Sequence, residues 1–129
     1  MNINVRQARE NDRNHIALCI AEGFKKDCDV LCKDTHKVSA AISTGIQISK
    51  FYVAEFENKV IGVLAISDCK GRAATTDIAS YKKNFGFIKG IIAYLVLKEE
   101  FEAPLDYPPT TGYIEFVAVR NAYQRKGIA

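Results

Sequence analysis

The residues best suited to chemistry stand at the end of the sequence, where a polar turn follows an apolar strand. Residues 112–119 (GYIEFVAV) have the composition of a strand, and residues 120–129 (RNAYQRKGIA) carry a single glycine. Backbone N–H groups that converge at such a turn, especially where a helix begins, bind acidic phosphate esters. Gly127 would let the backbone approach a phosphate closely, and Ala129 keeps the next turn small. Taken alone, this segment also fits an ordinary surface turn.

The string YIEFVAVRNAYQRKGIA resembles motif A of the GNAT superfamily of N-acetyltransferases. That motif is a strand followed by Gln or Arg, two residues, Gly, one residue, and Gly or Ala; Gln124, Gly127 and Ala129 match its three defining positions. The resemblance implies a GNAT-like acyl-CoA N-acyltransferase fold of the α/β class. It also implies that an acetyl group passes from acetyl-CoA to a primary amine of a small molecule or peptide, by direct attack in a ternary complex.

The resemblance also assigns roles to individual positions. In the family, one N–H of the strand polarises the thioester carbonyl while the strand backbone pairs with the pantetheine arm of CoA. In this sequence that role falls to the backbone of Val117, Ala118 and Val119. The resemblance further implies that the loop backbone binds the pyrophosphate of CoA. The loop residues are Gln124, Arg125, Lys126, Gly127, Ile128 and Ala129.

Acetyl transfer to an amine needs a neutral nucleophile, because a protonated amine, with a pKa of roughly 10, has no lone pair. Glu115 is the carboxylate best placed to remove that proton, directly or through a water molecule. Strict alternation along a strand puts Glu115 on the same face as Tyr113, which we interpret as a packing residue, and Val117. A second interpretation stays open, in which Glu115 pairs with a neighbouring cation in the sheet.

The cysteines offer a separate, weaker hypothesis. Cys19, Cys28, Cys32 and Cys69 form no CxxC pair, so free thiols are expected. If residues 28–36 were helical, Cys28, Cys32 and His36 would share one face and could bind zinc in an interaction domain. No fourth ligand is indicated, so we expect no metal. His15 is interpreted as a half-buried surface residue of a helix.

Composition and charge narrow the class of protein. The 129 residues are 48% hydrophobic and 26% charged, which is ordinary for a single domain over residues 1–129. The net charge of +3 is small and its cations are scattered, so no nucleic-acid partner is expected. Residues 1–10 lack the features of a signal peptide, and the apolar run 88–97 is too short to span a bilayer. We therefore expect a cytoplasmic protein with no membrane partner.

Periodicity and turn residues predict the elements that must position these groups, in a mixed sheet of order β-α-α-β-β-α-β. Asn58 is expected to make a tight turn between two strands, and Gly45, Gly86 and Gly90 are the weak points of the helices. We expect strands at residues 3–8, 51–56, 60–67 and 112–119. We expect a first helix that contains Ile16 to Phe24, followed by helices at residues 36–49 and 77–101.

Two departures from the GNAT pattern affect these expectations. Residues 68–111 are much longer than the usual hairpin, so they should form a lid over the acceptor or an added helix packed on the sheet. The proposed lid residues are Tyr81, Phe85, Phe87, Ile88, Ile91, Ile92 and Leu95. The sequence also stops at the loop, without the family's later helix and tyrosine acid. The 129-residue chain is therefore expected to fold marginally or to associate through the edge of strand 112–119, and to lack turnover. The alternative is a non-catalytic module that binds CoA or a partner.

Overall fold

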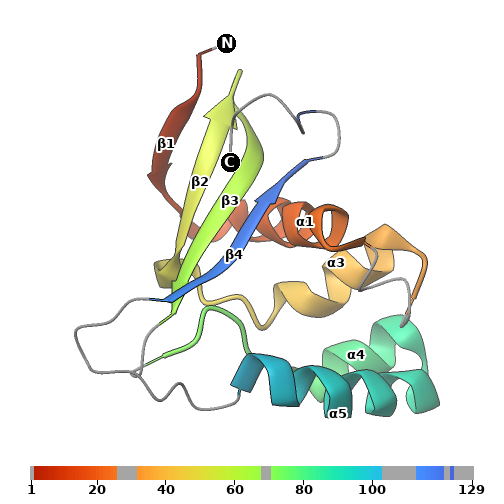
Figure 1. Ribbon diagram of the computed structural model, residues 1–129. Helices are drawn as coiled ribbons and strands as arrows, with labels where there is room; N and C mark the ends of the chain where they lie inside the picture. The colour runs from red at the N-terminus through yellow and green to blue at the C-terminus, as the bar shows by residue number, and fades with distance from the viewer. Residues whose placement is uncertain (1, 26–31, 68–70, 103–112, 121–122, 124–129) are drawn as a thin grey trace.

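A four-stranded antiparallel sheet organises the chain (Figure 1). The computed structural model describes residues 2–25, 32–67, 71–102, 113–120 and 123. Its strands are β1 (Asn4–Gln7), β2 (Phe51–Phe56), β3 (Lys59–Ser67) and β4 (Tyr113–Val119), in the spatial order β1-β2-β3-β4. The expected strands are therefore present. The expectation of a mixed sheet is wrong for the described residues, because each neighbouring pair is antiparallel.

The turn between β2 and β3 has the conformation that its residues suggest. Glu57 and Asn58 have φ angles of 50° and 64°, both left-handed. Two consecutive left-handed residues are typical of a tight hairpin turn whose twist matches that of the flanking strands. Asn58 adopts this conformation at little cost, whereas Glu57 was not expected to share it.

Four helices of the described residues accompany the sheet. They are α1 (Arg13–Gly23), which follows a 3₁₀ turn at Glu10–Asp12, then α3 (Thr35–Ser43), α4 (Ile78–Phe85) and α5 (Phe87–Glu102). Helix α1 lies behind the sheet in Figure 1 and packs on one of its faces. Buried Ile16 and Ile20 of α1 meet Val53 and Val63 of the two central strands in the main core.

Two helix expectations need correction. Helix α3 ends at Ser43 and does not reach residue 49. The helix ends because Gly45 lies against Thr75, so close that a Cβ atom on Gly45 would come within 1.9 Å of the Thr75 carbonyl oxygen. The Thr75 N–H also donates to the Gly45 carbonyl at 2.8 Å. The chain is thus pulled into a short pairing with residues 73–75. The expected helix 77–101 is two helices, broken at Gly86, whose φ of 91° a side chain would resist, while Gly90 stays inside α5.

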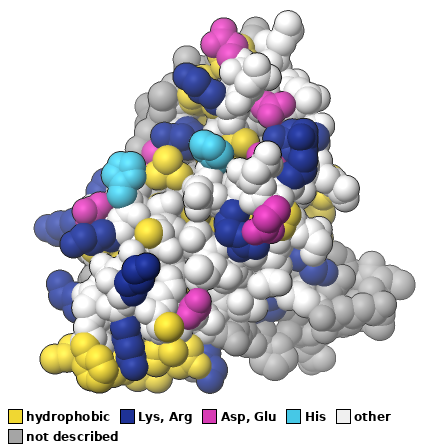
Figure 2. All heavy atoms as spheres, turned by 180° about the vertical axis from the view of Figure 1, so that it is seen from behind, with side chains coloured by type: hydrophobic (Ala, Val, Ile, Leu, Met, Phe, Trp, Pro, Cys, Tyr) yellow, Lys and Arg dark blue, Asp and Glu magenta, His cyan; other side chains and the backbone are white. Residues whose placement is uncertain are grey.

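The second core joins the α4–α5 pair to α3. Tyr81 of α4 is fully buried with Ala41 of α3 and Ala93 of α5. The pair therefore packs on a helix, which corrects the expectation of an added helix on the sheet. Figure 1 places it at the foot of the molecule, away from the end of β4, so it does not cover that end as a lid. Figure 2 shows its exposed apolar side chains gathered at one corner.

The two faces of the sheet differ in their surroundings. Val53, Val63 and Ala118 point into the core beneath α1 and are buried. The residues that alternate with them are open to solvent, notably Tyr52 and Val117. No described helix lies over this second face, which is turned toward the viewer in Figure 1.

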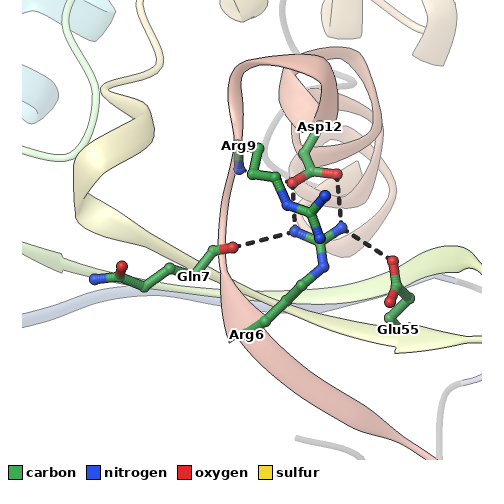
Figure 3. Close-up of polar contacts among 5 residues, drawn as sticks. All are labelled: Arg6, Gln7, Arg9, Asp12 and Glu55. Atoms are coloured by element: carbon green, nitrogen blue, oxygen red, sulfur yellow. Dashed lines mark hydrogen bonds and ion pairs between the residues drawn. The ribbon is translucent and has the colours of Figure 1, made fainter.

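An arginine in β1 ties the edge of the sheet to the start of α1 (Figure 3). The Arg6 guanidinium donates to both carboxylate oxygens of Asp12, at 2.8 and 3.0 Å, and to Glu55 of β2 at 3.0 Å. Asp12 is buried and also accepts from the Arg9 backbone N–H at 2.8 Å. Hydrogen bonds from Arg6 lower the pKa of both carboxyl groups, Asp12 and Glu55. Both are therefore held ionised.

We predict that Asp12→Asn lowers the free energy of unfolding by about 1–3 kcal/mol at pH 7, because it weakens a partly buried, charge-assisted contact. A pKa that is lower in the folded state gives stability above the unfolded value near 3.8, and this stability is lost as the pH falls through the folded value. The wild type should therefore lose more stability than Asp12→Asn between pH 5 and pH 3. Denaturant unfolding across this pH range measures the loss of stability, with Glu57→Gln as an exposed control. Parallel pH profiles for wild type and Asp12→Asn would contradict the prediction.

Candidate active site

Strand β4, which carries most of the expected site, has a neighbouring strand on one side only among the described residues. The Arg120 N–H donates to the Ile61 carbonyl at 2.7 Å, and Val63 pairs with Ala118. Because hydrogen-bonded pairs alternate in an antiparallel ladder, Ala118 directs its backbone groups toward β3 and Val117 directs its own away. Val117 therefore presents a backbone N–H and C=O on the open side of β4. This is the arrangement expected for a strand that pairs with an extended ligand.

The three strand residues differ in burial. The side chain of Ala118 is buried beneath α1, whereas Val117 is 43% exposed on the open face of the sheet. Val117, Val119, Leu64 and Gly62 border a shallow hollow of about 130 Å³ on that face. It is too small to hold a CoA molecule, so backbone contacts along the strand are the interaction that β4 offers.

Glu115 lies at an irregularity of β4. Ile114 pairs with Ile66 and Phe116 pairs with Ala65, so Glu115 is the extra residue of a bulge between β3 and β4. Two residues that flank Glu115 thus face neighbouring positions of β3. The strict alternation assumed from the sequence does not continue across Glu115, and its sharing a face with Val117 stays a prediction.

Helix α1 fixes the end of β4 by close contact. A Cβ atom on Gly23 would come within 2.7 Å of the Ala118 Cβ, so only a glycine lets the helix approach the strand this closely. One residue earlier, both Glu22 carboxylate oxygens accept from Arg120 Nε at 3.0 Å. Sequence reasoning missed this anchor because Glu22 and Arg120 are 98 residues apart and neither belongs to a recognisable motif.

Of the polar turn at residues 120–129, the structure describes Arg120 and Tyr123, which precede the expected loop. Tyr123 donates its backbone N–H to the Arg120 carbonyl at 2.8 Å, and its ring lies 6.1 Å from that of Phe56 in an edge-on contact. The chain thus turns toward the end of β2 immediately after β4. Residues 124–129, from Gln124 to Ala129, lie outside the described residues.

A larger polar hollow, of about 570 Å³, lies between the start of α1 and the β2–β3 turn. His15, an exposed side chain, lines it together with Asp12 and Glu55. Both carboxylates are bound to Arg6 and have a lowered pKa, which makes them poor proton acceptors near neutral pH. The hollow therefore supplies no general base from these two residues.

The structure describes two of the four cysteines, Cys19 and Cys32, and each bears on a different chemistry. Burial raises the pKa of the Cys19 thiol to about 12, so it carries almost no thiolate at neutral pH. Cys32 lies before α3, which begins at Thr35, so Cys32 and His36 are not on one helix as the zinc hypothesis requires. Cys28 and Cys69 lie outside the described residues. The described part of the chain contains no cluster of three or more His, Cys, Asp or Glu residues suited to a metal ion.

Comparison with solved structures identifies the fold. An N-acetyltransferase from Staphylococcus aureus Mu50 matches 97% of this chain over 69% of its own length, with a TM-score of 0.51 and 20% sequence identity. A second acetyltransferase matches 97% of this chain over 67% of its length, with a TM-score of 0.51 and 15% identity. No protein-family model and no curated protein sequence matches the chain. The chain is thus similar in fold to solved acetyltransferases.

No helix in the described part of the chain is long and apolar enough to cross a membrane.

We predict that Gly23→Ala destabilises the protein by about 1–3 kcal/mol, because the new methyl group would overlap Ala118 and push α1 away from β4. The sign of the change in stability is informative, because a Gly→Ala substitution in an exposed helix stabilises a protein by roughly 1 kcal/mol. Chemical denaturation measures the effect. Gly71→Ala is the matched control, because its Cβ would meet only the flexible end of Lys50 at 3.4 Å. A Gly23→Ala protein as stable as the wild type would show that α1 does not press on β4.

Proposed function

We propose that the protein is a GNAT-type N-acetyltransferase, which transfers an acetyl group from acetyl-CoA to a primary amine by direct attack in a ternary complex. The observation that carries the proposal is the position of β4. It is the last described strand of the sheet, Val117 turns its backbone groups to the open side, and the motif-like residues 124–129 follow shortly after. The fold shared with two solved acetyltransferases supports the same conclusion.

In this proposal the backbone binds the cosubstrate. The N–H groups from Gln124 to Ala129 hold the pyrophosphate, and Gly127 allows the close approach. Val117, Ala118 and Val119 form the strand that pairs with the pantetheine arm. The exposed side of Val117 fits this role, because an extended amide chain can pair with a strand that has unshared backbone donors and acceptors. The same donors would stabilise the negative charge that develops on the thioester oxygen.

Glu115 is proposed to remove the proton from the attacking amine. Two other carboxylates that the structure describes near this end of the sheet are already bound to arginines, Glu22 to Arg120 and Glu55 to Arg6. Glu115 lies two residues before Val117 on the same strand, at the bulge. A bulge locally redirects the chain, which is one way to aim a side chain at a site that regular pleating would miss.

Direct attack is favoured over a covalent acyl-cysteine at Cys19. That thiol is buried in the core, and its pKa of about 12 leaves almost none of it ionised. The acceptor is proposed to be a primary amine of a small molecule or peptide, which is uncharged when it attacks the thioester.

We predict that Gly127→Val weakens acetyl-CoA binding at least tenfold, about 1.4 kcal/mol, because a branched side chain would separate the loop backbone from the phosphates. Isothermal titration calorimetry measures the affinity, and Gly71→Val serves as the control glycine outside the loop. Unchanged affinity in Gly127→Val would remove the loop from the site.

We further predict that Glu115→Gln lowers kcat by roughly 100-fold in the full-length protein while acetyl-CoA affinity is kept, since the amide cannot accept the amine proton. The deficit should shrink as the pH rises and more acceptor amine is already neutral. A CoA-release assay across pH with a panel of amines tests this, with Glu57→Gln as the control. Wild-type turnover at each pH would leave Glu115 as a structural residue.

A further inference from the structure

Helix α5 is apolar on two opposite sides. Its inner side packs on α4, where Ala93 is buried and Gly90 lies so close that a Cβ would come within 2.5 Å of the Lys82 Cα. Its outer side carries a second stripe at helical spacing. The members of this outer stripe are Ile88, Ile92, Leu95 and Val96, which are 51–72% exposed. A helix that is apolar all round is normally buried on all sides, so the outer stripe lacks a partner in the described part of the chain.

The outer stripe is large for an exposed surface. Four apolar side chains at this exposure present an apolar area on the order of 400 Å², within the range of the largest patch on a typical monomer. Figure 2 shows apolar side chains gathered at the lower left corner, where the α4–α5 pair lies. Such a patch is expected to mark an interface.

The charges along α5 identify the kind of partner. Three lysines, Lys82, Lys83 and Lys89, lie at or beside its N-terminal end, and Lys82 Nζ sits 4.8 Å above the Phe87 ring. Glu99, Glu100 and Glu102 belong to the last turns of the helix and outnumber the one lysine there, Lys98. This order opposes the helix dipole, which favours acidic residues at the N-terminus and basic residues at the C-terminus. An isolated α5 is therefore charged unfavourably at both ends.

We propose that the outer stripe of α5 binds the same stripe of a second copy of this chain, with the two helices antiparallel about a two-fold axis. The lysine end of each helix then lies beside the glutamate end of the other, and the opposed dipoles are also compensated. Two stripes together bury on the order of 800 Å² of apolar area, and the charged side chains at the two ends bring the contact to about the lower bound for a specific interface. A parallel pair would place lysines against lysines.

This partner fits better than the alternatives. An anionic membrane would attract the lysine end but repel the glutamate end. The sequence predicted association through the edge of β4. Such a contact would compete with acetyl-CoA for the backbone groups on the open side of this strand. The α5 interface leaves that side of β4 open, so it is compatible with the proposed function and does not depend on it.

The test is sedimentation velocity and light scattering on the chain over about 1–100 µM. We expect a dimer that Leu95→Glu weakens at least tenfold, with unchanged circular dichroism because Leu95 is exposed. Val5→Glu, at a site 68% exposed on the open face of the sheet, is the matched control and should leave the dimer intact. A monomer at 100 µM, or a dimer lost in Val5→Glu but kept in Leu95→Glu, would overturn the proposal.

The orientation and the membrane alternative have their own tests. Lys89→Glu and Glu99→Lys should each weaken the dimer a few-fold, and the double variant should recover most of the affinity if the helices are antiparallel. Additive losses in the double variant would contradict that orientation. Flotation with phosphatidylglycerol-containing vesicles measures whether the protein binds an anionic lipid surface. A monomer that binds these vesicles only when Leu95 is intact would assign the stripe to a lipid surface and overturn the proposal.

Discussion

Arg6 links β1, β2 and the turn before α1 through its side chain, in addition to the backbone pairing of β1 with β2. Its guanidinium joins β1 to the turn before α1 through Asp12, and to β2 through Glu55. The side chains involved are mostly shielded from water, so the charges interact more strongly than a surface pair would. This contact fixes where α1 begins relative to the sheet. The position of its far end follows from the length of the helix.

The far end of α1 is where the proposed site is built. The helix is 11 residues long and ends at Gly23, which lies against Ala118 of β4. Glu22 holds Arg120 at the point where β4 ends. The strand is therefore supported from the core side and from its end, and no strand of the described residues pairs with its other side. A rigid strand with pre-positioned donors is what stabilisation of a thioester oxygen requires, since donors already in place need no reorganisation during the reaction.

Local signals in the sequence predicted the elements but not their packing. Alternation and β-branched residues located the strands, and Asn58 located the hairpin turn. The end of α3 was missed, because Gly45 is needed for a contact with Thr75, thirty residues away in sequence. The placement of α4 and α5 was missed for a similar reason, since burial of Tyr81 against Ala41 is a tertiary contact that no local pattern encodes.

The sequence likewise predicted some residues of the candidate site and missed others. Val117, Ala118 and Val119 were predicted from a strand next to a motif, and the structure adds that Val117 directs its backbone groups to the open side. The bulge at Glu115 could not be read from the sequence, because it depends on the register between β3 and β4. The Arg6 network and the Glu22–Arg120 pair were also missed, since charged residues carry no mark of their distant partners.

Hydrogen exchange measured by NMR or mass spectrometry, with and without acetyl-CoA, tests the central claim most directly. If β4 binds the cosubstrate along its open side, saturating acetyl-CoA should slow exchange at the Val117 N–H and in residues 124–129. Residues 78–102 of the α4–α5 pair should exchange at unchanged rates. Unchanged exchange at Val117 under saturating acetyl-CoA, or protection confined to other elements, would contradict the account.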